Sequence, residues 1–465
     1  TATVINPSNV IGSSTSLTGT IVITAASAPN APITIPVTVA VSLAASTSGG
    51  TLSQQGASQL ATGHLAVVHG IAYAPKHDVY LTVYEGPDGV RGRFMNTAGQ
   101  PVGAVFAIAT TPAQATSYAN KPMVAYSAGT ADDVFFVMYG SDYTKAADAV
   151  PSAWIQRVSF TGTGGARVGN PIAVGDGGWE IPNDIVYNPV TRQFVAVWER
   201  FFGSGPDVMV RFFNADGTAG SGIVNVSAAN NGQGAAKAAV DWERNRILIA
   251  YQGLHPNSPV NPEVLGMWAK IVDGTSGALL TGLLTVQAGF TIEAMPVFLP
   301  EVDGFLVTWT GFNPGRDVLG RYVSSLDASL GAMPNPIYPI AGSARSEGAP
   351  MGMYDAVSRR VLMAIQSSGG CPNDTCPFLD GAILTANGAV TSSFTGLSTV
   401  APSSRGGSFY PDVAVGEAGQ FGVSYTLDYF SVFNDRIVLS AADVPGPQFG
   451  APTTPVVGAT MAPSS

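Results

Sequence analysis

The sequence predicts an all-β protein, a seven-bladed β-propeller preceded by a separate β segment. The first observation behind this prediction is a phrase that occurs seven times: a short apolar strand, a turn, and a second apolar strand that ends on a large residue. The last positions of the phrase, 53 to 60 residues apart, are Tyr84, Tyr139, Trp198, Tyr251, Trp309, Ile365 and Tyr425. The second observation is the abundance of turn formers, with 55 Gly and 33 Pro in 465 residues, which suits many short strands. A repeat of about 50 residues with four short strands is typical of a propeller blade.

Residues 1–46 differ from the repeats. The segments GTIVITAAS (19–27) and PITIPVTVAVS (32–42) alternate apolar and small polar residues and predict two strands joined by a turn. This pair resembles the closing hairpin of bacterial immunoglobulin-like modules, in which a G-T-hydrophobic-T strand precedes a P-V-T-V strand. Because a complete sandwich takes about 100 residues, the resemblance implies a partial immunoglobulin-like segment. Preceding residues of a longer chain, or strands from elsewhere, would complete its sheet.

Within each repeat, the apolar pair (strands A and B) is followed by a strand C, a polar turn and a strand D. The recurring F-L-V-x-W and G-R-x-F-N-x-x-G patterns resemble those of secreted bacterial propeller-repeat proteins. Examples are FLVTW (305–309), GRFMNTAG (92–99, with Met for the Phe) and VRFFNADG (210–217, with Val for the first Gly). The likeness covers about 390 residues and implies a fold rather than an activity. We expect a linker at 47–59, the propeller at 60–455 and a tail at 456–465. The strand that closes the ring is left open between residues 446–455 and residues 50–60.

Strand C carries a basic residue at one equivalent position in five repeats: Arg93, Arg157, Arg211, Lys270 and Arg321. We interpret these side chains as structural. Their long stems would cover apolar surface while the charged heads reach solvent or a neighbouring blade.

Composition excludes several classes of function. A net charge of −10 leaves no basic stripe for nucleic acid and disfavours anionic membrane surfaces. No apolar run approaches the roughly 20 residues that span a bilayer. Cys371 and Cys376, the only cysteines, predict a local disulfide, since no further Cys or His nearby in sequence would complete a metal site. Few thiols and few charges fit a secreted or cell-surface protein with no metal and no cofactor.

Loop lengths predict which face of the propeller binds. The A–B and C–D turns are short and alike, whereas the B–C loops are long and dissimilar, such as 140–153, 252–263 and 367–378. In a four-stranded meander the B–C and D–A connections emerge on one face, and variable loops on a rigid scaffold usually carry binding. Candidate ligand-binding residues in the D–A connections are Tyr118, Trp179, Glu180, Glu293, Arg345, Glu347, Arg405, Phe409 and Tyr410.

These residue types suit a glycan or a protein surface, because aromatic rings stack on apolar faces and carboxylates accept hydrogen bonds from hydroxyls. Glu180, Glu293 and Glu347 come from three repeats and could converge near the axis, as the paired carboxylates of a glycosidase do. However, the S-x-D-x-G-x-x-W turn of propeller sialidases is missing, and no catalytic residue is assigned. The sequence therefore favours a non-enzymatic binding or structural module, with the N-terminal segment as a possible means of self-assembly. The alternative is a polysaccharide-active hydrolase or lyase that uses acidic residues of the D–A loops.

Overall fold

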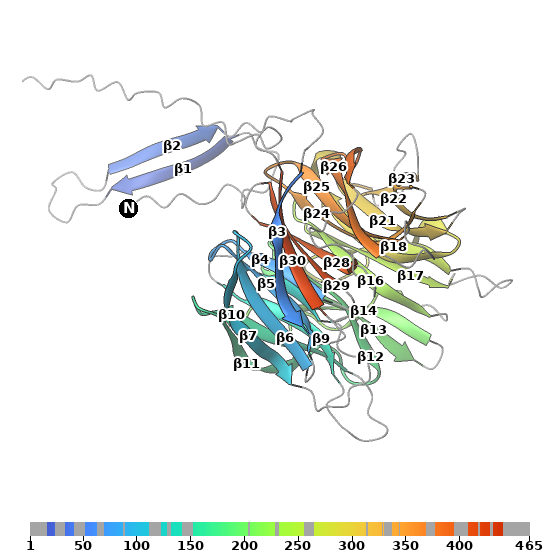
Figure 1. Cartoon of the computed structure of the whole chain (residues 1–465), viewed down its shortest axis with the longest axis horizontal. Helices are drawn as coiled ribbons and strands as arrows, with labels where there is room; N and C mark the ends of the chain where they lie inside the picture. Colours follow the sequence, from blue (N-terminus) through green and yellow to red (C-terminus); the bar gives the residue numbers. More distant parts are fainter. Residues whose placement is uncertain are drawn as a thin grey trace, which may run out of the picture.

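The computed structural model describes residues 16–23, 33–40, 52–62, 69–86, 89–110, 122–127, 132–141, 152–202, 205–227, 232–254, 265–312, 315–327, 329, 337–343, 345–368, 377–394, 408–416, 419–427 and 431–439. These residues form seven four-stranded antiparallel sheets and one separate pair of strands (Figure 1). The innermost strand of each sheet contacts the innermost strand of the next, in the cyclic order β4, β8, β12, β16, β20, β24, β28 and back to β4. The molecule is therefore a closed seven-bladed propeller.

Six of the blades are consecutive in sequence. Blade 1 consists of β4 (His69–Ala74), β5 (Val79–Gly86), β6 (Gly89–Asn96) and β7 (Pro101–Thr110). Blade 2 consists of β8 (Met123–Tyr126), β9 (Phe135–Ser141), β10 (Ser152–Phe160) and β11 (Gly165–Ala173). Blade 3 consists of β12 (Glu180–Asn188), β13 (Gln193–Phe202), β14 (Gly205–Asn214) and β15 (Val224–Asn225). Blade 4 consists of β16 (Gln233–Asp241), β17 (Arg246–Leu254), β18 (Leu265–Asp273) and β19 (Leu284–Ala288). Blade 5 consists of β20 (Thr291–Leu299), β21 (Gly304–Phe312), β22 (Arg316–Ser324) and β23 (Tyr338–Ala341), with a 3-10 turn at Pro300–Val302. Blade 6 consists of β24 (Ser346–Asp355), β25 (Arg360–Ser368), β26 (Pro377–Thr385) and β27 (Val390–Phe394).

Blade 7 combines the two ends of the repeat region. Its inner strands are β28 (Ser408–Val415), β29 (Gln420–Leu427) and β30 (Ser431–Leu439), and its outer strand is β3 (Leu52–Thr62). β3 runs antiparallel to β30, with Leu52 opposite Leu439. Of the two candidates for the strand that closes the ring, residues 50–60 overlap β3, so part of the expected linker at 47–59 belongs to this outer strand. β3 covers the edge of β30, which would otherwise expose unpaired backbone groups.

The hydrophobic core is divided into layers between neighbouring blades. One cluster, for example, combines Val83 and Phe94 of blade 1 with Phe135 and Tyr139 of blade 2. The seven predicted closing residues of strand B are at most 3% exposed, and all but Tyr84 belong to such clusters. One blade alone would leave both of its faces apolar, so burial requires the ring.

The face that carries the A–B turns is geometrically uniform. In all seven turns a residue one or two positions before strand B has a positive φ, between 35° and 71°: Asp78, Asp133, Arg192, Asn245, Asp303, Arg359 and Gly419. Side chains of these turns bridge neighbouring blades. Lys76 and Asp133 are 2.6 Å apart, as are Arg192 and Asp132.

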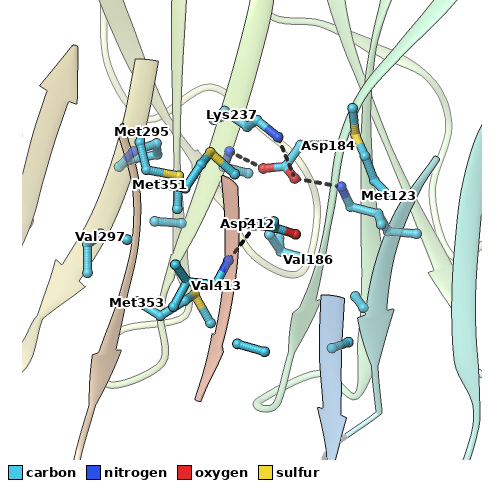
Figure 2. Close-up of a pocket in the computed structure, with 18 of the residues that line it drawn as sticks. Met123, Asp184, Val186, Lys237, Met295, Val297, Met351, Met353, Asp412 and Val413 are labelled. Carbon is cyan, nitrogen blue, oxygen red and sulfur yellow. Dashed lines mark hydrogen bonds and ion pairs between the residues drawn. The ribbon is translucent and has the colours of Figure 1, made fainter. Parts of the chain in front are cut away.

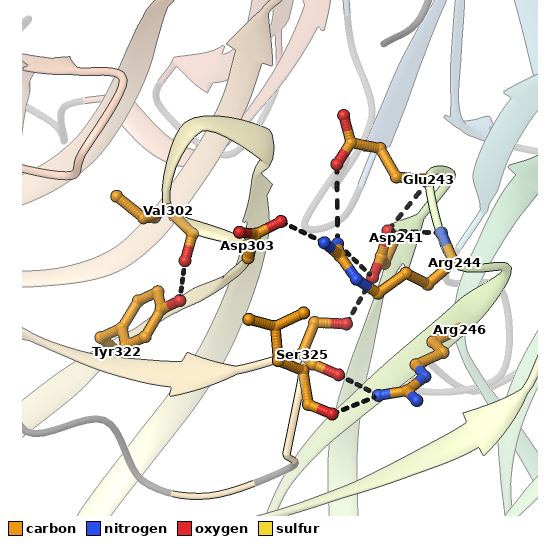
Figure 3. Close-up of polar contacts among 9 residues, drawn as sticks. Asp241, Glu243, Arg244, Arg246, Val302, Asp303, Tyr322 and Ser325 are labelled. Atoms are coloured by element: carbon orange, nitrogen blue, oxygen red, sulfur yellow. Dashed lines mark hydrogen bonds and ion pairs between the residues drawn. The ribbon is translucent and has the colours of Figure 1, made fainter. Parts of the chain in front are cut away.

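Several polar contacts join blades 4 and 5 on this face (Figure 3). The Arg244 guanidinium pairs with Asp303 of blade 5 and also lies 3.5 Å from the carboxylates of Asp241 and Glu243. The Ser325 hydroxyl donates to the buried Asp241, and Arg246 donates to the Ser325 carbonyl. This face is thus cross-linked by short polar contacts between blades.

The basic residues of strand C also join blades. Arg211 donates to the Val174 carbonyl at 3.0 Å, and Arg321 donates to the Val286 carbonyl at 2.6 Å. Both acceptors belong to the preceding blade. The structural interpretation of these two arginines is confirmed.

Strands β1 (Ser16–Ile23) and β2 (Ile33–Ala40) form a two-stranded antiparallel sheet of their own, with Ser16 opposite Ala40 (blue in Figure 1). Their side chains lie outside the described residues. The predicted pair of strands is present. Its immunoglobulin-like character stays an expectation.

Candidate functional site

A central channel runs along the propeller axis and encloses a cavity of about 670 Å³. Residues of all seven innermost strands line it. Figure 2 shows a largely apolar wall, with several methionines and a group of charged residues. This volume falls within the range of small-molecule sites.

One equivalent position of each innermost strand forms a ring that we call the mouth row. Each member lies opposite the residue that precedes the closing residue of strand B. Its members, in blade order, are Gly70, Met123, Asp184, Lys237, Met295, Met351 and Asp412. All but Gly70 line the cavity. Three flexible thioethers and three charges therefore share one level of the channel.

The two aspartates of the mouth row hold neighbouring blades together. Asp184 Oδ2 accepts a hydrogen bond from the Ala238 amide of blade 4 at 2.8 Å, and Asp412 Oδ2 accepts one from the Ile71 amide of blade 1 at 2.9 Å. The inner edges of these strands have no further strand to pair with, so side chains satisfy their amides. Lys237 Nζ lies 3.6 Å from Asp184. Burial raises the pKa of Asp412 to about 6, against the opposing effect of the Lys237 charge.

A second ring of contacts lies nearer the face of the D–A connections. Here the strand registers shift at β-bulges, and three bulge residues, Ala235, Glu293 and Ala349, have φ between 46° and 61°. The preceding blade accepts a hydrogen bond from each of their amides. The acceptors, at 2.7, 3.2 and 2.7 Å, are the side chains of Glu199, Gln252 and Glu293. Bulges bend the strand and re-aim its side chains, so they shape the entrance to the channel.

Of the three predicted glutamates, only Glu293 lines the cavity. Its carboxylate accepts hydrogen bonds from Thr310 Oγ1 at 2.7 Å and from the Ala349 amide, and it lies 3.1 Å from Arg316 Nη2. Most of its hydrogen-bonding capacity is therefore taken up within the protein.

Glu180 and Glu347 are buried at the start of their strands and do not line the cavity. Glu180 accepts a 3.3 Å hydrogen bond from the Ala153 amide, and burial raises its pKa. Glu347 accepts hydrogen bonds from the amide and hydroxyl of Ser343, and burial raises its pKa as well. The cavity therefore does not bring the three carboxylates together.

Trp179 is half exposed and stacks on Phe201, with ring centroids 4.9 Å apart. Arg345 Nη1 lies 3.3 Å from Asp380 Oδ2 within blade 6. The remaining predicted residues cannot be compared. Tyr118, Arg405, Cys371 and Cys376 lie outside the described residues, as do the side chains of Phe409 and Tyr410. The disulfide stays a prediction.

Sequence reasoning missed the mouth row, the exposed Phe290 and Phe312, and the half-buried Phe201. A signal for Phe201 and Phe312 was present, because each is the third residue after the closing tryptophan of its strand B. The mouth row mixes Gly, Met, Asp and Lys, so no shared residue type marks it in the sequence.

Among the described residues, no group of three or more His, Cys, Asp or Glu could hold a metal ion. In the same part of the chain, no helix has the length and apolar character needed to cross a bilayer.

Comparisons with protein-family models and with curated proteins each found no match. Similar solved structures include an ulvan lyase bound to -[GlcA(1-4)Rha3S]-, with 10% identity, a TM-score of 0.52, and coverage of 82% of this chain and 95% of that one. They also include a Hadza microbial sialidase, with 10% identity, a TM-score of 0.47 and coverage of 76% and 74%. The Dos1 propeller matches with 7% identity, a TM-score of 0.44 and coverage of 83% and 95%. At these identities the likeness concerns the fold alone.

Proposed function

We propose that the protein is a non-enzymatic recognition module, secreted or displayed at the cell surface, and that it binds a glycan through the face of its B–C and D–A connections. The observation that carries this proposal is that the three acidic residues at the start of the innermost strands are buried or hydrogen-bonded within the protein. Glu293 is hydrogen-bonded to the next blade, and Glu180 and Glu347 are buried away from the cavity. Carboxylates held in this way serve the scaffold, whereas a glycosidase needs two that flank one bond.

The difference between the two faces also supports the proposal. On the A–B side, ion pairs such as Arg192 with Asp132 and Arg244 with Asp303 join adjacent blades. On the other side, Trp179, Phe290 and Phe312 expose large rings to solvent. Exposed aromatic surface on a rigid scaffold is typical of a binding face.

A glycan array combined with a turnover screen tests this function. We expect the wild-type protein to bind at least one glycan without cleaving it. The variants Glu180→Gln and Glu347→Gln should keep that binding but lose thermal stability, because each glutamate is buried and accepts a backbone amide. Cleavage of any bound glycan by the wild type would contradict a purely binding role.

A polysaccharide hydrolase or lyase is the second candidate, and one observation favours it. Glu347 Oε2 is buried with no hydrogen-bond partner among the described residues, and its pKa is raised by burial. A carboxyl whose pKa is raised in this way suits a general acid. Turnover that disappears in Glu347→Gln while the melting temperature is unchanged would establish this alternative.

The N-terminal pair of strands is proposed to mediate self-assembly. A two-stranded sheet is marginal in water and leaves pairing edges exposed. Pairing of β1 or β2 with strands of another copy would cover those edges.

A further inference from the structure

Two pairs of aromatic rings occupy equivalent places on blades 3 and 5. Trp179 accepts a backbone hydrogen bond from Phe201 at 2.9 Å, and their rings stack at 4.9 Å with an interplanar angle of 30°. Phe290 precedes Thr291, which pairs with Gly311, so Phe290 lies across from Phe312. Those two rings meet edge to face, with centroids 4.6 Å apart and an angle of 64°. Phe201 and Phe312 each follow the closing tryptophan by three residues, so both pairs lie at the same level of the same face.

These rings are unusually exposed for their size. Trp179 is 50% exposed and Phe290 54%, while every other tryptophan of the chain is buried or half-buried. Large apolar surface left open on a rigid scaffold indicates a ligand.

Each aromatic pair stands beside an arginine paired with a carboxylate. Arg200, next to Phe201, forms an ion pair with Asp176. Arg316 lies 3.1 Å from Glu293, and its guanidinium carbon is 5.9 Å from the centre of the Phe312 ring. Guanidinium groups only donate hydrogen bonds and carboxylates only accept them. A sugar has the matching chemistry, since its C–H face stacks on a ring while its hydroxyls both donate and accept.

Blade 4, between the two pairs, carries no side chain at the corresponding place on its inner strand. Gln233 pairs with Gly253, so the preceding Gly232 takes the position that Trp179 and Phe290 hold on their blades. A Cβ atom on Gly232 would lie 3.0 Å from Pro206 Cδ, which leaves little room for a larger residue. The inner strand of blade 4 therefore offers no aromatic ring at this position.

We infer that the two aromatic pairs are separate stacking subsites for one extended glycan chain, which crosses blade 4 over Gly232. The ligand class is a linear polysaccharide whose pyranose rings present flat C–H faces, such as a β-1,4-linked glucan, xylan or mannan. This inference rests on the proposed function and specifies its ligand class and its contact residues. The central cavity is not part of the subsites, because none of the four rings lines it.

The test measures binding of β-1,4-linked gluco-, xylo- and manno-oligosaccharides of two to eight sugars to the full chain by calorimetry. For at least one series, affinity should rise steeply once the chain is long enough to span both subsites. Trp179→Ala and Phe290→Ala should each weaken binding of the longest oligosaccharide at least tenfold. Trp179→Phe should stay within about threefold of wild type, because a stacking ring remains. Leu326→Ala is the matched control, since Leu326 is 57% exposed beyond the end of β22, on the side of the C–D turns, and its loss should leave affinity unchanged.

A second readout separates stacking from a loss of folding. Trp179 is the only exposed tryptophan, so oligosaccharide binding should quench or shift the tryptophan emission in the wild type and not in Trp179→Phe. Unchanged affinity in both alanine variants, with glycan binding intact, would overturn the two-subsite inference and leave the proposed function standing. If the protein binds none of these oligosaccharides, the inference is overturned. If it also binds nothing on the wider glycan array, the proposed function is overturned too.

Discussion

At the scale of single residues, the charged groups around the channel serve mainly to join blades. Asp412 of blade 7 accepts the Ile71 amide of blade 1, a contact between residues 341 positions apart. Glu293 does the same between blades 5 and 6. Of these two acids, the sequence makes only Glu293 a candidate for ligand binding or catalysis, because it lies in a D–A connection. Their hydrogen bonds explain why acidic residues recur there in a protein that is otherwise poor in charge.

Asp412 should give the protein a measurable pH dependence. Burial raises its pKa from 3.8 to about 6, so the folded state binds the proton more tightly than the unfolded state. The contribution of Asp412 to the free energy of unfolding is therefore largest below about pH 4 and falls as pH rises to about 6, by at most about 3 kcal/mol. Asp412→Asn should remove this slope in urea unfolding measured from pH 4 to 7.

Lys237→Met provides the directional control for that experiment. The Lys237 charge lowers the pKa of Asp412, so its removal should move the sloping region to higher pH. Identical pH profiles for wild type and Asp412→Asn would show that Asp412 does not titrate in this range.

At the scale of elements, the turns follow a strict backbone pattern. Every A–B turn enters strand B through a left-handed residue, and five C–D turns contain a left-handed glycine: Gly99, Gly162, Gly217, Gly277 and Gly388. Repetition of one turn geometry keeps the short strands in register from blade to blade. It also explains why these connections are short and alike in sequence.

Two glycines in the C–D turn of blade 2 allow the energetic cost of a side chain at a left-handed backbone position to be measured. Gly162 has φ +86°, Gly164 has no left-handed φ, and a Cβ at either position would meet nothing within 4 Å. We expect Gly162→Ala to lower the free energy of unfolding by about 1 kcal/mol through backbone strain. Gly164→Ala should be neutral, or stabilising by about 0.5 kcal/mol, because alanine restricts the unfolded chain. Equal urea midpoints for the two variants would contradict the backbone explanation.

At the scale of the whole molecule, stability depends on closing the ring. β3 supplies the outer strand of blade 7 and lies almost 400 residues from its partner β30 in sequence. Each blade buries its faces only against its neighbours, so an incomplete blade weakens two interfaces.

Two truncations distinguish the contribution of β3, which closes the ring, from that of β1 and β2. Removal of residues 1–46 leaves β3 intact and should not change the melting temperature of the propeller. Removal of residues 1–62 deletes β3 and should lower the melting temperature and increase proteolysis of blade 7. A synthetic peptide of residues 47–62 should reverse part of that loss. Equal melting temperatures for the two truncated proteins would show that β3 is dispensable.

The same shorter truncation tests self-assembly. If β1 and β2 pair with another copy, light scattering should show more copies per particle for the full chain than for the protein lacking residues 1–46. The C–D turn variant Gly164→Ala is a suitable control, because it alters neither strand. The same number of copies per particle in both proteins would rule out assembly through this pair of strands.

The sequence by itself determined the number of blades, the closing residues of strand B and the two unlike faces. These features repeat along the chain, because every blade must bury a large side chain against its neighbour. Only the tertiary structure decided how the ring closes, where Glu180, Glu293 and Glu347 direct their carboxylates, and which aromatic rings meet. Those outcomes depend on residues tens or hundreds of positions apart, such as Asp412 with Ile71 or Phe290 with Phe312, and such contacts leave no local pattern in the sequence.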